Sequence, residues 1–152
     1  MRTTRQATPI IYHNDEAFWI GGSKVLRSGK KDVATVVGAG ITLHEALKAY
    51  EELKKAGVMI RIIDLYSVKP IDAATLARSA DDTGAIITVE DHVAEGGIGE
   101  AVRSALSEHP VPVYALAVRR LPKSGKPEEL LDYEEISKNA IIGKVKEIRG
   151  IR

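Results

Sequence analysis

Short apolar runs alternate with amphipathic helical segments through most of this chain, and the alternation strongly limits the folds that it can adopt. The apolar runs lie at residues 33–37, 59–64, 85–89 and 113–118. Continuous apolar runs of this length are typical of strands that are buried on both faces of a parallel sheet. Strands that alternate with helices form βαβ units, whose crossovers are right-handed. The sequence therefore predicts a three-layer α/β/α sandwich with a mostly parallel sheet.

The region before residue 33 is less regular and predicts one further strand. Ser23–Arg27 has the composition of a strand, and residues 28–32 are typical of a turn into the next run. We expect a hairpin between this strand and the run at 33–37, with an antiparallel strand at the edge of the sheet. The predicted sheet has five strands.

Several helix boundaries carry recognisable signals. Thr42 and Glu45 have the spacing of a capping box, in which the two side chains satisfy free backbone N–H groups of the first turn. Asp72 and Ser137 are predicted N-caps. Pro127 suits the first position of a short helix.

Length and composition exclude several classes of protein. The chain has 152 residues, which suits one domain, and 22 basic residues nearly balance 21 acidic ones. This balance gives no overall field to favour nucleic acid or an anionic membrane surface as a partner. There are no cysteines and no apolar run of about 20 residues that could span a bilayer. We expect a soluble, cytoplasmic protein.

Glycines and ionisable residues collect at the predicted carboxyl ends of the strands, where open α/β sheets usually bind ligands. They are Gly38, Gly40, Asp64, Glu90, Asp91 and His92. The two glycines and Asp64 resemble part of a dinucleotide fingerprint, but Leu43 stands where its third glycine is expected. The sequence favours a tight turn over a dinucleotide site, and the edge remains a candidate ligand site.

Two interpretations of the segment Glu90–His92 follow from its residue types. Neighbouring carboxylates on a strand point to opposite faces, so Glu90 and Asp91 can act as a pair only if the strand has already ended. A histidine such as His92 can exchange protons near neutral pH. The alternative is that these residues end the strand, bind loop amides and lie near a helix that begins around Gly97. The sequence favours this structural alternative.

A basic loop follows the last predicted strand. Its cations are Arg119, Arg120, Lys123 and Lys126. Such a loop could bind a phosphate or an acidic partner surface, although short basic loops are more often simply solvated. No aromatic residues are interleaved to stack nucleic-acid bases.

Four segments in order carry a resemblance to a known family. They are residues 36–46 (VVGAGITLHEA), 64–72 (DLYSVKPID), 88–101 (TVEDHVAEGGIGEA) and 121–127 (LPKSGKP). Together they resemble the C-terminal domain of transketolase over nearly the whole chain. Related domains occur in deoxyxylulose phosphate synthase and in the beta subunits of 2-oxoacid dehydrogenases, but the segment Pro-Lys-Ser-Gly-Lys-Pro favours transketolase.

The resemblance implies a sheet of four parallel strands and one antiparallel strand. It implies that residues 1–20 are a linker from a preceding pyrimidine-binding domain and that residues 21–152 form the C-terminal domain. The family transfers a two-carbon ketol unit between sugar phosphates, using thiamine diphosphate and a divalent metal (Mg or Ca) between two other domains of a homodimer. Arg5 matches the family's arginine that contacts the sugar phosphate.

No diphosphate-binding motif is present in this sequence, so we expect no catalytic, cofactor-binding or metal-binding residues on the chain and no activity from it alone. The expected role is assembly or regulation together with the cofactor-binding domains or subunits of a transketolase. Two alternatives remain. One is a stand-alone sensor of a small ligand or nucleotide, and the other is a docking module like that of the 2-oxoacid dehydrogenase beta subunits.

Overall fold

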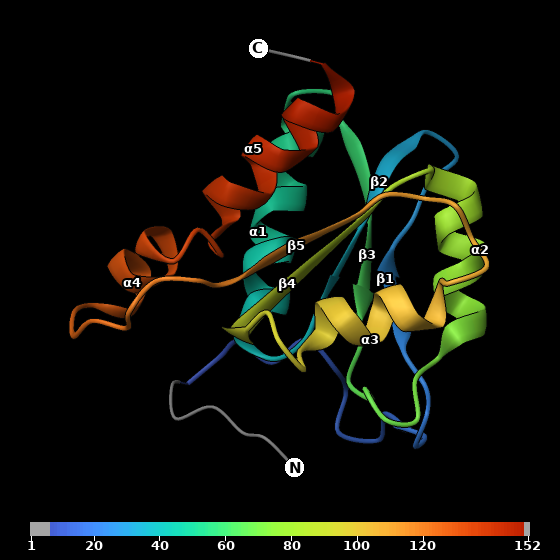
Figure 1. Cartoon of the computed structure of the whole chain (residues 1–152), viewed down its shortest axis with the longest axis horizontal. Helices are drawn as coiled ribbons and strands as arrows, with labels where there is room; N and C mark the ends of the chain where they lie inside the picture. Colours follow the sequence, from blue (N-terminus) through green and yellow to red (C-terminus); the bar gives the residue numbers. More distant parts are fainter. Residues whose placement is uncertain (1–6, 151–152) are drawn as a thin grey trace.

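A five-stranded sheet with helices on both faces organises residues 7–150, the part of the chain that the computed structural model describes (Figure 1). The strands are β1 (Lys24–Arg27), β2 (Asp32–Gly38), β3 (Met59–Asp64), β4 (Ile86–Val93) and β5 (Val113–Val118). The helices are α1 (Ile41–Lys55), α2 (Ala73–Thr83), α3 (Ile98–Ala105), α4 (Pro127–Tyr133) and α5 (Lys138–Arg149). No helix in this range is long and apolar enough to cross a membrane.

The strands lie in the order β1-β3-β2-β4-β5, with β1 antiparallel to β3 and all other pairs parallel. This confirms the predicted fold class and the antiparallel edge strand. The predicted hairpin is wrong, because β1 pairs with β3, Lys24 opposite Asp64, and does not pair with β2. The physical reason is that β2 already has parallel neighbours on both sides, so β1 cannot pair with β2 and joins the sheet at the free edge of β3.

Two apolar layers fill the space between the sheet and its helices. Successive strand residues face opposite layers, as Val36 and Val37 of β2 do. One layer packs against α1 and α5 and includes Leu53 and Ile141, while the other packs against α2 and α3 and includes Leu76. Helix α4 buries no residue and projects beside the sandwich (Figure 1). The four parallel strands are therefore held from both sides, which orders their carboxyl ends.

Three of the predicted helix boundaries are confirmed. Asp72 Oδ1 accepts a hydrogen bond from Thr75 N at 3.0 Å, Ser137 Oγ accepts one from Asn139 N at 3.2 Å, and Pro127 is the first residue of α4. These contacts satisfy backbone groups that a helix leaves free at its start.

The predicted capping box is wrong. Helix α1 begins at Ile41, and its N-cap, Gly40, makes no side-chain hydrogen bond. Thr42 is buried instead, and its hydroxyl lies 2.8 Å from the Val89 carbonyl oxygen, to which it donates. Glu45 accepts from the backbone N–H of Lys138 at 2.9 Å. Both side chains therefore join elements that are distant in sequence, and this use outweighs local capping.

Candidate functional site

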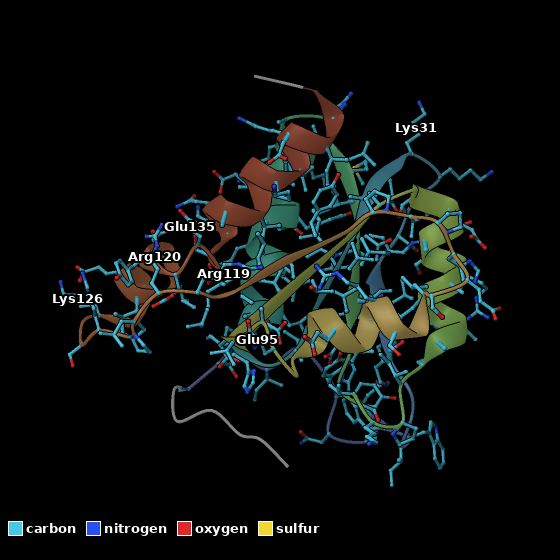
Figure 2. The ribbon with its side chains drawn as sticks, in the orientation of Figure 1. Lys31, Glu95, Arg119, Arg120, Lys126 and Glu135 are labelled. Carbon is cyan, nitrogen blue, oxygen red and sulfur yellow. The ribbon has the colours of Figure 1, made fainter. Side chains whose placement is uncertain are left out.

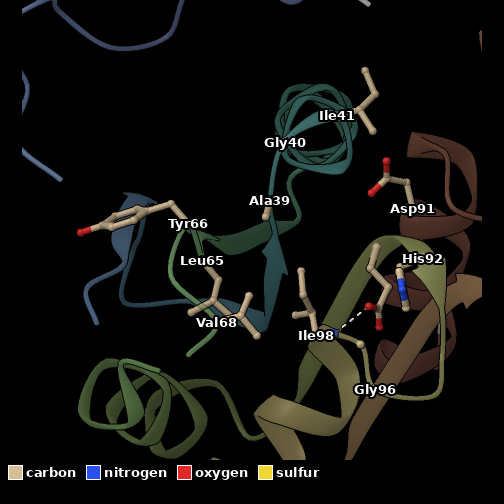
Figure 3. Close-up of a pocket in the computed structure, with 12 residues that line it drawn as sticks. Ala39, Gly40, Ile41, Leu65, Tyr66, Val68, Asp91, His92, Gly96 and Ile98 are labelled. Atoms are coloured by element: carbon tan, nitrogen blue, oxygen red, sulfur yellow. Dashed lines mark hydrogen bonds between the residues drawn. The ribbon is translucent and has the colours of Figure 1, made fainter. Parts of the chain in front are cut away.

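A pocket of about 330 Å³ lies at the carboxyl edge of the sheet, between the starts of α1 and α3 (Figure 3). Its walls are formed by the segments that follow β2 and β3, by the end of β4 and by the approach to α3. The lining residues are Ala39, Gly40, Ile41, Leu65, Tyr66, Val68, Glu90, Asp91, His92, Gly96, Gly97 and Ile98. Of the residues that the sequence placed at this edge, Gly40, Glu90, Asp91 and His92 line the pocket, whereas Gly38 and Asp64 do not.

Glu90 is buried and its carboxylate caps helix α3. Oε2 accepts from the backbone N–H of Ile98 at 2.6 Å and Oε1 from that of Gly99 at 3.0 Å, and Figure 3 marks the bond to Ile98. A side chain at Gly97 would overlap this carboxylate. The amino end of α3, which could otherwise attract an anion, is therefore already neutralised from within the chain. This geometry matches the structural alternative for Glu90.

Asp91 and His92 are exposed, because β4 departs from regular pairing before it ends. The register between β4 and β5 shifts between Val89 and Val93. His92 Nδ1 lies 2.8 Å from the Val93 carbonyl oxygen, and Asp91 lies on the pocket wall near Ile41 (Figure 3). Glu90 points inward to α3, while Asp91 and His92 face outward. Glu90 and Asp91 therefore do not form a carboxylate pair.

The glycines of the β2–α1 turn serve close packing and chain direction. A Cβ on Gly38 would lie 3.1 Å from the backbone nitrogen of Leu43, so the helix start would have to move by a few tenths of an ångström to admit a side chain. Gly40 has φ +60°, a conformation that glycine adopts readily. This geometry is that of the tight turn favoured by the sequence.

Asp64, at the end of β3, is bound by Tyr12, a residue that the sequence did not indicate as part of this site. Its Oδ2 accepts a hydrogen bond from the Tyr12 hydroxyl at 2.6 Å. Burial raises the pKa of Asp64 above its usual range, although the Tyr12 hydrogen bond partly offsets this shift. The pKa of Tyr12 is also raised, first by burial and then by its bond to Asp64. The partners are 52 residues apart, and no local pattern predicts such a contact.

The N-terminal segment before β1 is fixed along this edge by several contacts. The ring of Phe18 packs edge-to-face on Tyr12 and on Tyr66, each at 4.9 Å between ring centres. The ammonium group of Lys24 lies 4.6 Å from the centre of the Phe18 ring and pairs with Glu16. We call residues 12–23 the clasp, because this part of the N-terminal segment is bound to the end of β3 and the loop after it.

In the basic loop after β5, Arg120 lies beside α4 and the residues after it (Figure 2) and Lys123 contacts the same region, whereas Arg119 donates back to the Ala115 carbonyl oxygen at 3.3 Å. Arg120 donates to the Tyr133 carbonyl oxygen at 2.6 Å and to Glu135 at 2.8 Å. Arg120 and Lys123 also lie over the Tyr133 ring. These contacts give the loop a structural role in positioning α4.

Residues 7–150 contain no group of three or more histidine, cysteine, aspartate or glutamate side chains placed to hold a metal ion. Arg5, the predicted phosphate contact, lies outside the described residues.

Comparison with known families fits this geometry. The sequence model of the family described as "Transketolase, C-terminal domain" matches residues 21–141. The chain belongs to this family. It is 55% identical over 149 residues to mouse transketolase-like protein 2, covering 97% of this chain and 24% of that protein. It is 50% identical over 153 residues to human transketolase, covering 99% of this chain and 24% of that enzyme. The chain thus spans about a quarter of the length of these relatives.

Solved structures agree with this assignment. A split-gene transketolase, described as an inactive beta4 tetramer, superposes with a TM-score of 0.89 at 34% identity. The match covers 97% of this chain and 48% of that one. Transketolase from Campylobacter jejuni gives a TM-score of 0.61 at 18% identity, covering 84% of this chain and 18% of that one, and supports the fold alone.

Proposed function

We propose that this chain is the non-catalytic C-terminal domain of a thiamine-diphosphate-dependent transketolase, which transfers a two-carbon ketol unit between sugar phosphates. Its proposed role is to support assembly with the cofactor-binding domains or subunits. The observation that carries the proposal is the use of Glu90, because the most prominent acid–base candidate at the edge is consumed in holding α3. The match to only a quarter of the human enzyme's length supports the same conclusion.

The described residues do not fit thiamine diphosphate or its metal ion. The amino end of α3, where a diphosphate could bind, is already occupied by the Glu90 carboxylate. No metal-ligand cluster exists within residues 7–150. We therefore place both groups on the partner domains, where Arg5 would contact the sugar phosphate only once those domains fix its position.

The proposal is tested by mixing the purified chain with ketose phosphate, aldose phosphate, thiamine diphosphate and magnesium. We expect no ketol transfer from this chain alone. Turnover that persists through repeated purification, and that is lost when Glu90 or Asp91 is replaced, would show a catalytic site here and contradict the proposal.

A second candidate function is a sensor for a small ligand in the edge pocket. The pocket volume, near 330 Å³, and its apolar surface from Ile41, Leu65, Val68 and Ile98 favour it. A thermal-shift panel distinguishes the two functions, since a ligand at 100 times its dissociation constant stabilises a protein by about 2.7 kcal/mol. An upward shift with one ligand of the panel, abolished by Ile98→Asp, would support the sensor.

A further inference from the structure

Trp19 and Ile20 project from an ordered turn at the carboxyl edge of the sheet. Trp19 is 76% exposed and Ile20 is 88% exposed, which is unusual for two large apolar side chains side by side. Gly22 N donates to the Trp19 carbonyl oxygen at 2.9 Å, and Gly21 has φ +84°. These are the features of a type II turn, with Ile20 and Gly21 as its central residues.

The turn is hydrogen-bonded to the loop that follows β3. Gly21 N donates to Ser67 Oγ at 2.9 Å, and the same hydroxyl donates to the Pro70 carbonyl oxygen at 2.8 Å. On its N-terminal side, Phe18 packs between Tyr12 and Tyr66. The backbone of the turn is therefore held in one conformation while its apolar side chains face solvent. Binding through such a turn costs little ordering entropy, because its shape is already set.

Exposed apolar side chains gather around this turn and the strand ends. Those within residues 7–150 are Ile10, Ile11, Phe18, Trp19, Ile20, Val25, Val68, Val93 and Leu121. All except Val25 and Leu121 lie in the N-terminal segment or at or just beyond the carboxyl ends of β3 and β4, whereas Leu121 lies in the loop between β5 and α4. Figure 1 shows the N-terminal segment, in blue, running along this end of the molecule. One end of the sheet therefore carries the apolar surface that a partner could cover.

The position of the turn indicates which partner covers it. In the relatives, this domain accounts for about a quarter of the protein, so a much larger part of the enzyme lies outside the match. The turn lies in the segment through which the preceding domain would join, fewer than 20 residues from Arg5. The preceding domain would therefore lie within reach of the turn.

We propose that the Trp19–Ile20 turn is a preformed docking knob that inserts into an apolar recess of the preceding transketolase domain. The recess must also offer a hydrogen-bond acceptor, since a buried indole N–H needs a partner. Trp19 and Ile20 are the anchors, because buried aromatic and branched side chains at the centre of an interface dominate its affinity. This inference rests on the proposed assembly function and names the surface that performs it.

Trp19 is the only tryptophan in the chain, so its replacement by 7-azatryptophan, which can be excited apart from the partner's tryptophans, gives emission that reports on this site alone. The chain is titrated with the transketolase chain that carries the thiamine-diphosphate-binding domains of the same source. We expect a blue shift of the emission and loss of acrylamide quenching as the complex forms. Calorimetry should show that Ile20→Ala and Trp19→Ala each raise the dissociation constant of the complex at least tenfold. Leu121→Ala, which truncates a side chain that is 85% exposed beyond β5, is the matched control and should bind as wild type does.

The outcomes separate the knob from the function on which it rests. A complex in which Trp19 stays as quenchable as in the free chain, or in which Ile20→Ala binds like Leu121→Ala, would overturn the knob and leave the assembly function standing. Absence of any complex would contradict the assembly function and the knob together. A dimer of this chain alone with protected Trp19, seen by light scattering, would assign the turn to a second copy and overturn the proposed partner.

Discussion

At the scale of single residues, Glu90 and Gly97 form one unit. The carboxylate accepts two backbone N–H groups at the start of α3, and charge-assisted bonds of this kind are stronger than neutral ones. Glycine is needed at position 97 because any side chain there would occupy the space of the carboxylate. The pairing Glu90 with Gly97 therefore reflects steric fit and helix capping.

Gly97→Ala should lower the free energy of unfolding by about 2–4 kcal/mol. The new Cβ would displace the buried Glu90 carboxylate from Ile98 and Gly99 and leave it without its hydrogen bonds. Urea unfolding followed by circular dichroism measures the loss. Gly143→Ala is the control: it lies in α5 with open space around it, and should be neutral or stabilising by about 0.5–1 kcal/mol. Equal effects at both positions would refute the steric argument.

Asp64 predicts a pH dependence of stability. Its folded-state pKa is raised by burial above the unfolded value of about 3.8. The stability contributed by such a group is fully present below the unfolded pKa and is lost as the pH rises through the folded pKa. Wild type should therefore lose stability relative to Asp64→Asn as the pH rises from about 4 toward neutrality.

Urea midpoints measured across that pH range for both proteins test this expectation. The asparagine keeps an oxygen that can accept from Tyr12 but carries no titrating charge. Asp15→Asn, at an exposed position in the same segment, is the control and should follow the wild-type profile. Parallel profiles for Asp64→Asn and wild type would contradict the assignment of a raised pKa to Asp64.

At the scale of elements, sequence patterns within one segment predicted strands and helix ends well. Contacts between distant segments could not be predicted in this way. The strands β3 and β5, the caps Asp72 and Ser137 and the start of α4 all follow from neighbouring residues. The β1–β3 pairing and the role of Glu45 depend on packing between distant parts of the chain. Such packing competes with local preferences and here outweighs a capping-box signal.

The candidate site divides in the same way. The edge of the sheet could be located from sequence, because parallel strands bring their carboxyl ends together. The capping of α3 by Glu90 also follows from its closeness to Gly97. The Tyr12–Asp64 bond could not be predicted, since it depends on the path of an irregular segment across the edge.

Glu45 is expected to stabilise the packing of α1 against α5. Its buried carboxylate binds the first backbone N–H of α5, at Lys138, and the ammonium group of Lys48, and so joins α1 to α5. Glu45→Ala should cost about 2–3 kcal/mol, in the range of hydrogen bonds to a charged group, and should increase amide exchange in α5. Glu51→Ala, at an exposed position of α1, should change stability by less than about 0.5 kcal/mol. A loss confined to α1 would contradict a link between the helices.

At the scale of the whole molecule, the packed sheet and helices hold the carboxyl edge of the sheet in place. Helices cover both faces of the sheet, so its broad surfaces are buried, and we propose the carboxyl edge as the place for contact with other domains. The pocket, the clasp and most of the exposed large apolar side chains lie at this edge or in the segment that crosses it. We therefore expect this chain to add to a larger transketolase and to have no independent turnover.

The decisive measurement is ketol-transfer activity across a size-exclusion profile with light scattering, for this chain, for its cofactor-binding partner chain and for their mixture. We predict no activity from this chain alone and a new, heavier peak in the mixture that carries most of the activity. Full activity in the partner's own peak, with this chain eluting separately, would contradict the account.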